Sequence, residues 1–219
     1  MNEHTLTVKG IGNVSVNPDL IIITMSLTTS RFDYSQAMER IAAKTESLRN
    51  SLISIGYEGK ALKTTDFNIS TKYESYKDSK GDWKQKFAGY SCSHDLKLEF
   101  DLDMKRFGET LGAISASTTS PQFQIAFSVK DKNAVQTELL ERAVSNAADK
   151  AAILAKASGV TLGAIRNIDY SWSELRLYSH TTTTFNKMEL MERKESFSMD
   201  IEPEDIEVKD TVTVMWDIQ

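Results

Sequence analysis

Apolar and polar residues alternate along the start of the chain. Two segments show this pattern, TLTVKGIGNVSV at 5–16 and LIIITMSLTT at 20–29. Alternation and short apolar runs are typical of β-strands. The residues Asn17, Pro18 and Asp19 lie between the segments and favour a turn. The sequence therefore predicts two strands joined by this turn.

The spacing of apolar residues becomes helical after residue 33. Asp33 is a suitable N-cap, with Gln36 at the third position beyond it. The helix is expected to end near Gly56. The positions that recur every three or four residues are Tyr34, Met38, Ile41, Thr45, Leu48, Leu52 and Ile55.

Two longer strands, a second helix and another strand are predicted next. The strands span about 62–76 and 86–101, and the polar segment KDSKGDWKQ is expected to be their hairpin loop. The helix MKRFGETLGAISAS begins at Met104, and the strand FQIAFSV follows Pro121. The order β-α-β-β-α-β over about 20–130 is that of a ferredoxin-like core, in which two helices cover one face of an antiparallel sheet.

A third, alanine-rich helix is predicted at 132–158, with Gly159 as its left-handed end. Alanine recurs at every fourth position, and small residues let a helix approach a sheet closely. The polar face mixes acidic and basic residues, whereas a membrane-surface helix is rich in Lys and Arg. We therefore expect the helix to pack on the protein's own sheet. The alanines are Ala143, Ala147, Ala151 and Ala155, and the packing stripe is taken as Leu140, Val144, Ala147, Ala151 and Leu154.

The elements combine into one α+β fold. We expect the core at about 20–130 to be extended by the first strand, the alanine-rich helix and two C-terminal strands near 163–175 and 207–218. The first and last strands should share a sheet, because each would otherwise leave a bare edge. The whole chain, 1–219, is expected to be a single domain, or two sub-lobes with 1–19 and 131–219 forming the second.

Composition limits the chemistry. A net charge of −5 and a pI near 5.3 argue against a nucleic-acid partner. The single cysteine, Cys92, cannot form an internal disulfide, and Cys92 with His94 on one strand face is too few ligands for zinc. Gly10-x-Gly12 lacks the third glycine of a dinucleotide site, and the P-loop, serine-hydrolase and zinc-protease motifs are absent from the sequence. No metal, cofactor or catalytic residue is expected.

The sequence also bears on location. No apolar run reaches the roughly 18 residues of a membrane span. The start, MNEHTLTVKG, has neither the basic nor the apolar region of a secretory signal. We expect a cytoplasmic protein, and a periplasmic or cell-envelope protein is the alternative if a signal has been removed.

The first segment resembles a known family. VKGIGNVSVNPDLIIITMSL is similar to the V-x-G-x-G-x-V-x-V-x-P-D-x-A opening of the SIMPL-domain family, bacterial proteins often described as periplasmic immunogenic proteins. The resemblance covers about Thr5 to Ile218, with departures at Leu20 and at Pro203-Glu204-Asp205. Its later matches are Lys63-Thr64 with Tyr73, Gly89-Tyr90, the segment 143–165 and IEVKDTVTVMWDI.

What the family resemblance implies is structural. Family members are associated with oxidative-stress tolerance, with oligomeric assemblies in the envelope and, for a distant animal namesake, with adaptor work in signalling. No catalytic residue comes with the resemblance. The motif residues are Gly10, Gly12, Pro18, Asp19, Gly89, Tyr90, Gly159 and Gly163. Gly10 and Gly12 suit a bulge or a close strand approach.

Two classes of function remain. The first is a non-enzymatic self-assembling or protein-interaction module, linked to stress tolerance. The second is an enzyme or small-molecule binder with a cleft between the core and the additional elements. We favour the first and expect a homo-oligomer in which 176–206 takes part, because the family resemblance implies assembly and because methionines and aromatics are enriched at interfaces. Its candidate interface residues are Met188, Leu190, Met191 and Phe197.

Overall fold

The computed structural model describes residues 4–119, 121–170, 176–179 and 201–219. The chain divides into two compact units. The first combines Met1–Asp19, Ser128–His180 and Pro203–Gln219, and the second combines Leu20–Phe127 and Thr181–Glu202. Helices and antiparallel strands both occur, which confirms the predicted α+β class. That the chain folds as a single domain, or as two sub-lobes, stays a prediction.

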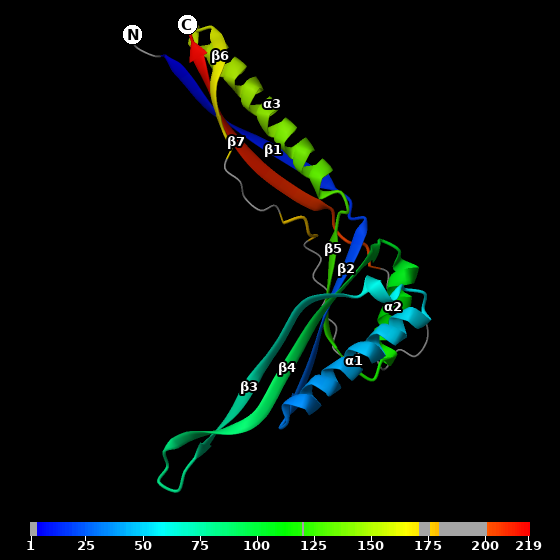
Figure 1. Ribbon diagram of the computed structural model, residues 1–219. Helices are drawn as coiled ribbons and strands as arrows, with labels where there is room; N and C mark the ends of the chain where they lie inside the picture. The colour runs from blue at the N-terminus through cyan, green and yellow to red at the C-terminus, as the bar shows by residue number, and fades with distance from the viewer. Residues whose placement is uncertain (1–3, 120, 171–175, 180–200) are drawn as a thin grey trace. The chain divides into compact units, whose positions relative to one another are not determined.

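The second unit contains a four-stranded sheet with two helices beside each other on it (Figure 1). Strands and helices follow in the predicted order, and the sheet order is β3-β4-β2-β5, with β4 antiparallel to both neighbours. That this core is ferredoxin-like stays a prediction. The elements are β2 (Leu20–Arg31), α1 (Tyr34–Ser54), a 3-10 turn (Gly59–Ala61), β3 (Lys63–Lys77), β4 (Trp83–Asp101), α2 (Met104–Ala116) and β5 (Gln122–Ser128).

One apolar core fixes the two helices on this sheet. The Gln36 backbone N–H donates to Asp33 Oδ1 at 3.1 Å, so the predicted N-cap of α1 is confirmed. Asp103 caps α2 in the same way. Buried side chains from both helices and from the strands form the core cluster, which includes Ile23, Leu98, Ile41, Leu48, Phe107, Leu111 and Phe127.

The first unit contains a three-stranded sheet with the order β1-β7-β6. Its elements are β1 (Thr5–Val16), α3 (Lys132–Ser158), β6 (Leu162–Asp169) and β7 (Ile206–Ile218). β1 pairs with β7 in one unbroken register, from Thr5↔Asp217 to Val16↔Ile206. The first and last strands therefore share a sheet, as predicted. β1 and β2 are neighbours in sequence but belong to different sheets.

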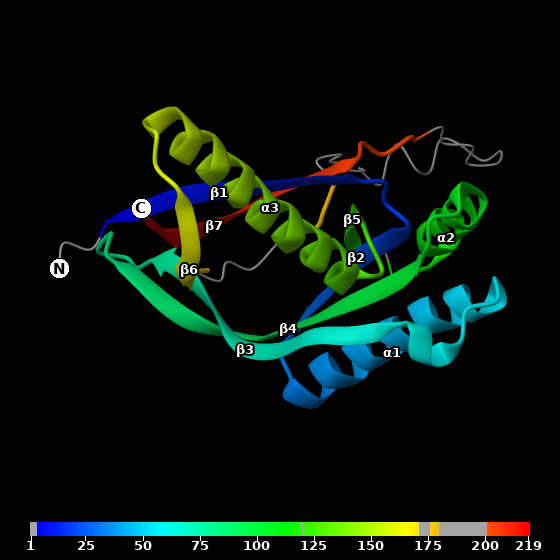
Figure 2. The ribbon, with the colours of Figure 1, turned by 90° about the horizontal axis from the view of Figure 1, so that it is seen from above.

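Helix α3 runs along β1 and β7 (Figures 1 and 2). Ala143, Ala147 and Ala151 are fully buried and contact Val212, Val214 and Trp216 of β7 in one cluster. A Cβ on Gly10 would lie 2.7 Å from the Ala147 Cβ, closer than real side chains come. Gly10 therefore allows α3 to approach β1 closely. The alternative that we gave, a β-bulge at Gly10, is wrong, because the register between β1 and β7 has no irregularity.

Side chains of α3 also cover the outer edge of β1. Asn146 Oδ1 accepts from the Ile11 backbone N–H at 3.0 Å, and Lys150 Nζ donates to the Lys9 carbonyl oxygen at 3.2 Å. Arg142 donates to the Asn13 carbonyl oxygen at 2.9 Å. These helix residues are spaced by four and the strand residues by two, so a single row of side chains satisfies three of the backbone groups that β7 does not reach.

Two details of the predicted helix and hairpin are wrong. Val144 and Leu154 are 38% and 45% exposed, and Leu140 is half-buried. The row from Ala143 to Ala155 faces the sheet, because only methyl groups fit above Gly10 and Gly12. The predicted hairpin loop is also too long: β3 extends to Lys77 and β4 begins at Trp83.

The end of α3 follows from Gly159, which takes φ 69°. Its backbone N–H donates to the Lys156 carbonyl oxygen, and the Val160 N–H donates to the Ala155 carbonyl oxygen, which is the Schellman pattern. Gly163 in β6 lies close to Asp217, where a Cβ would come 3.0 Å from the carbonyl oxygen. Pro18 is buried, and Asp19 Oδ1 accepts from the Lys130 backbone N–H at 2.8 Å.

Enlarging the alanine row should destabilise the first unit. Ala147→Leu adds atoms where α3 already contacts β1, and overpacking of this kind costs about 1–3 kcal/mol. Ala148→Leu is the matched control, because Ala148 is exposed. Urea unfolding should show a lower free energy for Ala147→Leu alone. Equal stability of the two variants would mean that α3 does not pack through its alanines.

Candidate interaction surface

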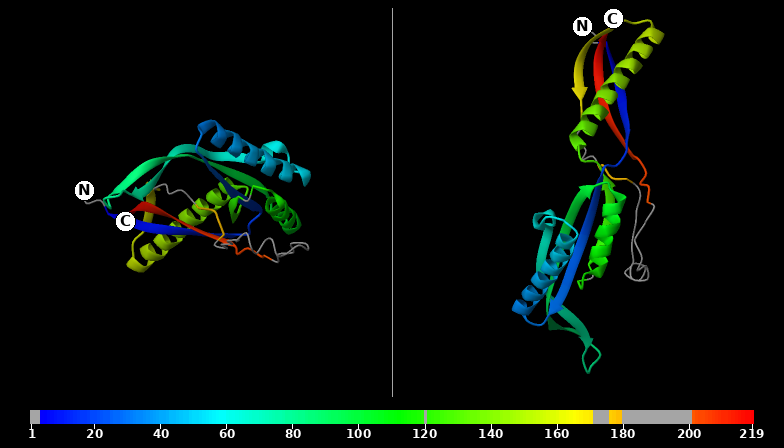
Figure 3. Two further views of the ribbon diagram at one scale, coloured as in Figure 1. Left: turned by 90° about the horizontal axis from the view of Figure 1, so that it is seen from below. Right: turned by 90° about the vertical axis from the view of Figure 1, so that its right-hand side faces the viewer.

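The hairpin of β3 and β4 extends beyond the rest of its sheet (Figure 3). β2 ends at Arg31, which pairs with Tyr90, so the part of β4 from Trp83 to Gly89 pairs with β3 alone. Gly89 has φ 111° and lies where a Cβ would come 2.8 Å from the Phe32 Cα. It thus provides a bend at which the hairpin leaves the sheet as a two-stranded ribbon.

Aromatic rings cluster where the ribbon leaves the sheet. Phe87 lies in the middle, with ring centroids 5.4 Å from Phe32, 6.1 Å from Tyr73 and 5.4 Å from Tyr90. All three contacts are edge-to-face, the geometry that the ring quadrupole favours. Trp83 lies on the strand face of Tyr73 and Phe87 by register. We call the set Phe32, Tyr34, Tyr73, Trp83, Phe87 and Tyr90 the aromatic face.

The aromatic face is open to solvent. Phe32 is 72% exposed, Trp83 70% and Tyr73 55%. A contiguous exposed apolar surface of this kind marks a binding site, because isolated exposed apolar residues are common but clusters are not. Trp, Tyr and Phe are also the residues enriched at protein interfaces. The aromatic face is therefore the candidate interaction surface in the described part of the chain.

The outer strand β3 is a second open feature of the ribbon. It is the last strand of its sheet, and every residue except Ile69 is exposed. Its pairing with β4 is irregular between Thr64 and Asp66 and again between Lys72 and Tyr73. We call the regular stretch between these irregularities, residues 66–72, the edge segment. In the described residues no side chain of another element hydrogen-bonds its backbone.

His94 ties β3 to the core. Its Nδ1 lies 2.8 Å from Thr45 Oγ1 of α1, and its Nε2 lies 2.8 Å from Thr64 Oγ1 of β3. The ring also contacts Phe67 edge-to-face at 5.2 Å. Burial lowers the pKa of His94, with a smaller opposing effect from Asp95. A neutral imidazole, with one N–H donor and one acceptor nitrogen, suits two hydroxyl partners.

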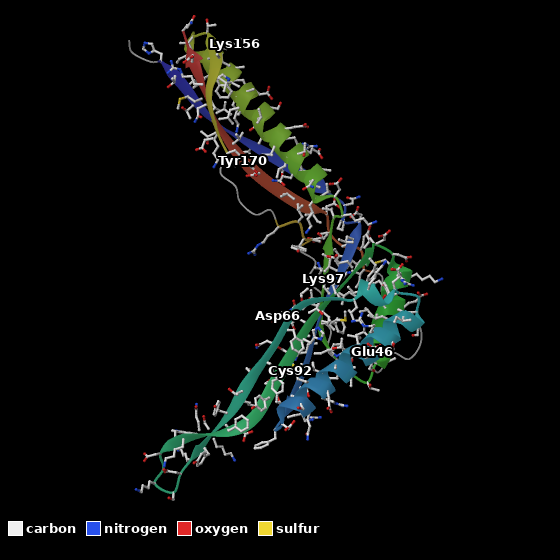
Figure 4. All side chains as sticks on the ribbon, in the orientation of Figure 1. Glu46, Asp66, Cys92, Lys97, Lys156 and Tyr170 are labelled. Atoms are coloured by element: carbon white, nitrogen blue, oxygen red, sulfur yellow. The ribbon has the colours of Figure 1, made fainter. Side chains whose placement is uncertain are left out.

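Cys92 and the expected interface residues are the remaining sequence candidates. Cys92 is buried between the sheet and α1 (Figure 4), and burial raises the pKa of its thiol. A raised thiol pKa leaves little nucleophilic thiolate. Within the described ranges, no His, Cys, Asp and Glu side chains are grouped as a metal site would require. The expected interface residues Met188, Leu190, Met191 and Phe197 lie outside the described residues.

A family model matches almost the whole chain. The family described as "SIMPL: Protein of unknown function (DUF541)" matches residues 6–216. The chain belongs to the SIMPL family. The match includes the two glycines that let α3 approach β1, Gly10 and Gly12, and the glycine at the bend of the hairpin, Gly89. The family description gives no biochemical function.

Two curated relatives of this SIMPL protein are similar over much of its length. Both are named 26 kDa periplasmic immunogenic protein, one from Brucella melitensis biotype 1 and one from Brucella abortus strain S19. Each is 27% identical over 164 residues, which is 74% of this chain and 65% of the relative. The match therefore spans slightly less than two thirds of the relatives' own length.

The relatives bear on location. Their name is periplasmic, which agrees with the alternative that we gave, and nothing in the comparisons supports the cytoplasmic expectation. Among the described residues, none of the helices has both the length and the apolar character of a membrane span.

The environment of His94 predicts a pH dependence of stability. Its pKa is lowered in the folded protein, so the unfolded chain binds the proton more tightly. The contribution of His94 to the free energy of unfolding is complete above the unfolded pKa of about 6.5. This contribution is lost as the pH falls from that value through the lower pKa of the folded protein. Urea unfolding at pH values on either side should show this loss. His94→Gln cannot titrate and should lose less stability on acidification, and an identical loss in both proteins would exclude the effect.

Proposed function

We propose that this SIMPL protein is a non-enzymatic self-assembling module that binds through the ribbon of β3 and β4. The observation that carries the proposal is the aromatic face, five aromatic residues in mutual ring contact with Trp83 on the same strand face, at a position where the sheet leaves most of them exposed. Aromatic side chains with one or two side-chain rotations lose little entropy when they are buried in a contact. These side chains are therefore suited to a binding contact and not to catalysis.

The ribbon also needs a partner on physical grounds. An isolated two-stranded hairpin is only marginally stable in water, and a third strand or a packed face stabilises it. Complete burial of an aromatic side chain removes about 150–250 Å² from water. A second protein surface on the aromatic face would supply this burial and would hold the ribbon in one conformation.

The cell envelope is the proposed location, and stress tolerance the proposed setting. The relatives' printed name supports the location. Self-association, and not catalysis, is then the property that the folded chain contributes there. The expected homo-oligomer is part of this proposal, with the aromatic face of the ribbon as one of its contacts.

Removing two aromatic rings should reduce the oligomer. The variant Trp83→Ser/Phe87→Ser deletes the tip and the centre of the aromatic face without touching the core cluster. Size exclusion with light scattering at micromolar concentration should give an oligomer for the intact protein and a smaller species for the variant. The matched control is Ile153→Ser, which removes an apolar side chain that is 66% exposed on α3.

Two outcomes would contradict the proposal. An intact protein that runs as a monomer at micromolar concentration would exclude self-assembly. An oligomer of unchanged mass in the double variant would exclude the aromatic face as its contact.

A further inference from the structure

The outer strands β1 and β3 differ in whether side chains hydrogen-bond their outward backbone groups. At β1, the side chains of Arg142, Asn146 and Lys150 bond three backbone groups of the outer edge. At β3, the edge segment 66–72 has no such cover in the described part of the chain. An exposed outer strand is a template for another strand, and native proteins usually block it with proline, bulges or covering elements. The edge segment itself has no proline, bulge or covering element among the described residues, and its charged residues, Asp66 and Lys72, lie at its two ends.

The irregularities of β3 limit where another strand could pair. They fall between Thr64 and Asp66 and between Lys72 and Tyr73, so pairing on the outer side would also be regular only over residues 66–72. This length is that of an ordinary strand, about five to six residues or slightly more. Its midpoint is Ile69.

The edge segment is complementary to itself in the antiparallel direction. The sequence from 66 to 72 is DFNISTK. If Ile69 faces Ile69 of another copy, then Asp66 faces Lys72, Phe67 faces Thr71 and Asn68 faces Ser70, and each unlike pair occurs twice. Opposite charges directly across two strands stabilise their pairing, and so do polar side chains that can bond each other. Neither Asp66 nor Lys72 forms an ion pair within the described residues.

The faces of the strand agree with this register. Phe67 contacts His94, and Ile69 packs against the core cluster, so these side chains lie on the helix-covered face. Asp66, Asn68, Ser70 and Lys72 alternate with them and lie on the other face. Asp66 is labelled on β3 in Figure 4. With Ile69 on the axis, each face of one copy continues the same face of the other.

Two other registers of the same kind, with the axis at Ser70 or at Tyr73, are poorer. An axis at Ser70 would place Asp66 opposite Glu74 and Lys63 opposite Lys77, and like charges across strands are destabilising. An axis at Tyr73 would pair Lys72 with Glu74 but would put an irregularity at the centre. A shift by one residue would turn the apolar face of one copy onto the polar side of the other.

We propose that residues 66–72 of β3 pair with the same residues of a second copy, antiparallel and around a two-fold axis at Ile69. The inference rests on the proposed self-assembly and specifies one of its contacts. The contact is isologous, so it closes as a dimer with one continuous sheet. The ribbon beyond Tyr73 extends past the paired residues, and its aromatic face stays available to join dimers into larger assemblies.

Cysteine cross-linking tests the register. Asn68→Cys and Ser70→Cys are made as separate proteins of different tagged mass, and the buried Cys92 stays silent. Cross-strand partners have Cβ atoms near the distance of a disulfide, whereas diagonal neighbours are about 7–8 Å apart. Mild oxidation of the mixture should give the mixed disulfide, and each protein alone should give little. Thr7→Cys, exposed on β1, is the control.

Charge reversal provides a second measurement that does not depend on disulfide geometry. Asp66→Lys places two pairs of lysines across the axis, and Lys72→Asp places two pairs of aspartates there. Sedimentation should show about tenfold weaker dimerisation for each variant alone, since both pairs become repulsive. A mixture of the two variants should dimerise as the intact protein does, because every pair then has opposite charges.

The outcomes separate this inference from the proposed function. An intact monomer would overturn both. An oligomer without the mixed disulfide above the control, and with dimerisation that is insensitive to the two charge reversals, would overturn the β3 pairing alone. A mixed disulfide together with rescue by mixing would establish it.

Discussion

The outer strand of a β-sheet has backbone N–H and C=O groups that no strand of its own sheet can satisfy, and this constraint shapes both units. In the first unit, β1 meets it through α3. The helix can lie close enough because Gly10 and Gly12 have no side chain and because alanine recurs at every fourth position. From there Arg142, Asn146 and Lys150 reach the free edge.

In the second unit, no described side chain bonds the outward backbone groups of the edge segment of β3. β3 is the outer strand, and α1 and α2 pack on the face of the sheet and not along its edge. His94 and the core hold β3 at Thr64 and Ile69, so the edge segment is positioned but uncovered. A positioned and uncovered edge is ready to bind a strand with little loss of entropy, because its conformation is already fixed.

Much of the fold was predictable because periodicity records burial. The bounds of α3, the N-cap Asp33 and the pairing of the first and last strands follow from spacing and cap chemistry. The alanines Ala147 and Ala151 of the predicted α3 stripe are buried as expected, but its leucine and valine positions were placed incorrectly because a leucine or valine counts as more apolar than an alanine. Contact with a glycine-lined strand selects the smallest residues instead, and this preference depends on the partner strand.

The candidate surface was harder to predict. The segment that contains Trp83 has the lysines, aspartates and glycine of a loop, yet β4 begins at that tryptophan. A signal did exist, since Tyr73, Trp83 and Phe87 are residues that favour strands and interfaces. The limits of the edge segment were beyond prediction, because a strand irregularity depends on the register between two strands and not on either sequence alone.

Hydrogen exchange as a function of protein concentration tests the edge contact most directly. If β3 pairs with β3 of a second copy, the amides of 66–72 that point away from β4 become protected as the concentration rises, whereas the Ile11 amide of β1, already bonded to Asn146 of α3, does not change. Exchange of 66–72 that is equally fast at every concentration, in a protein that nevertheless forms oligomers, would contradict pairing through β3.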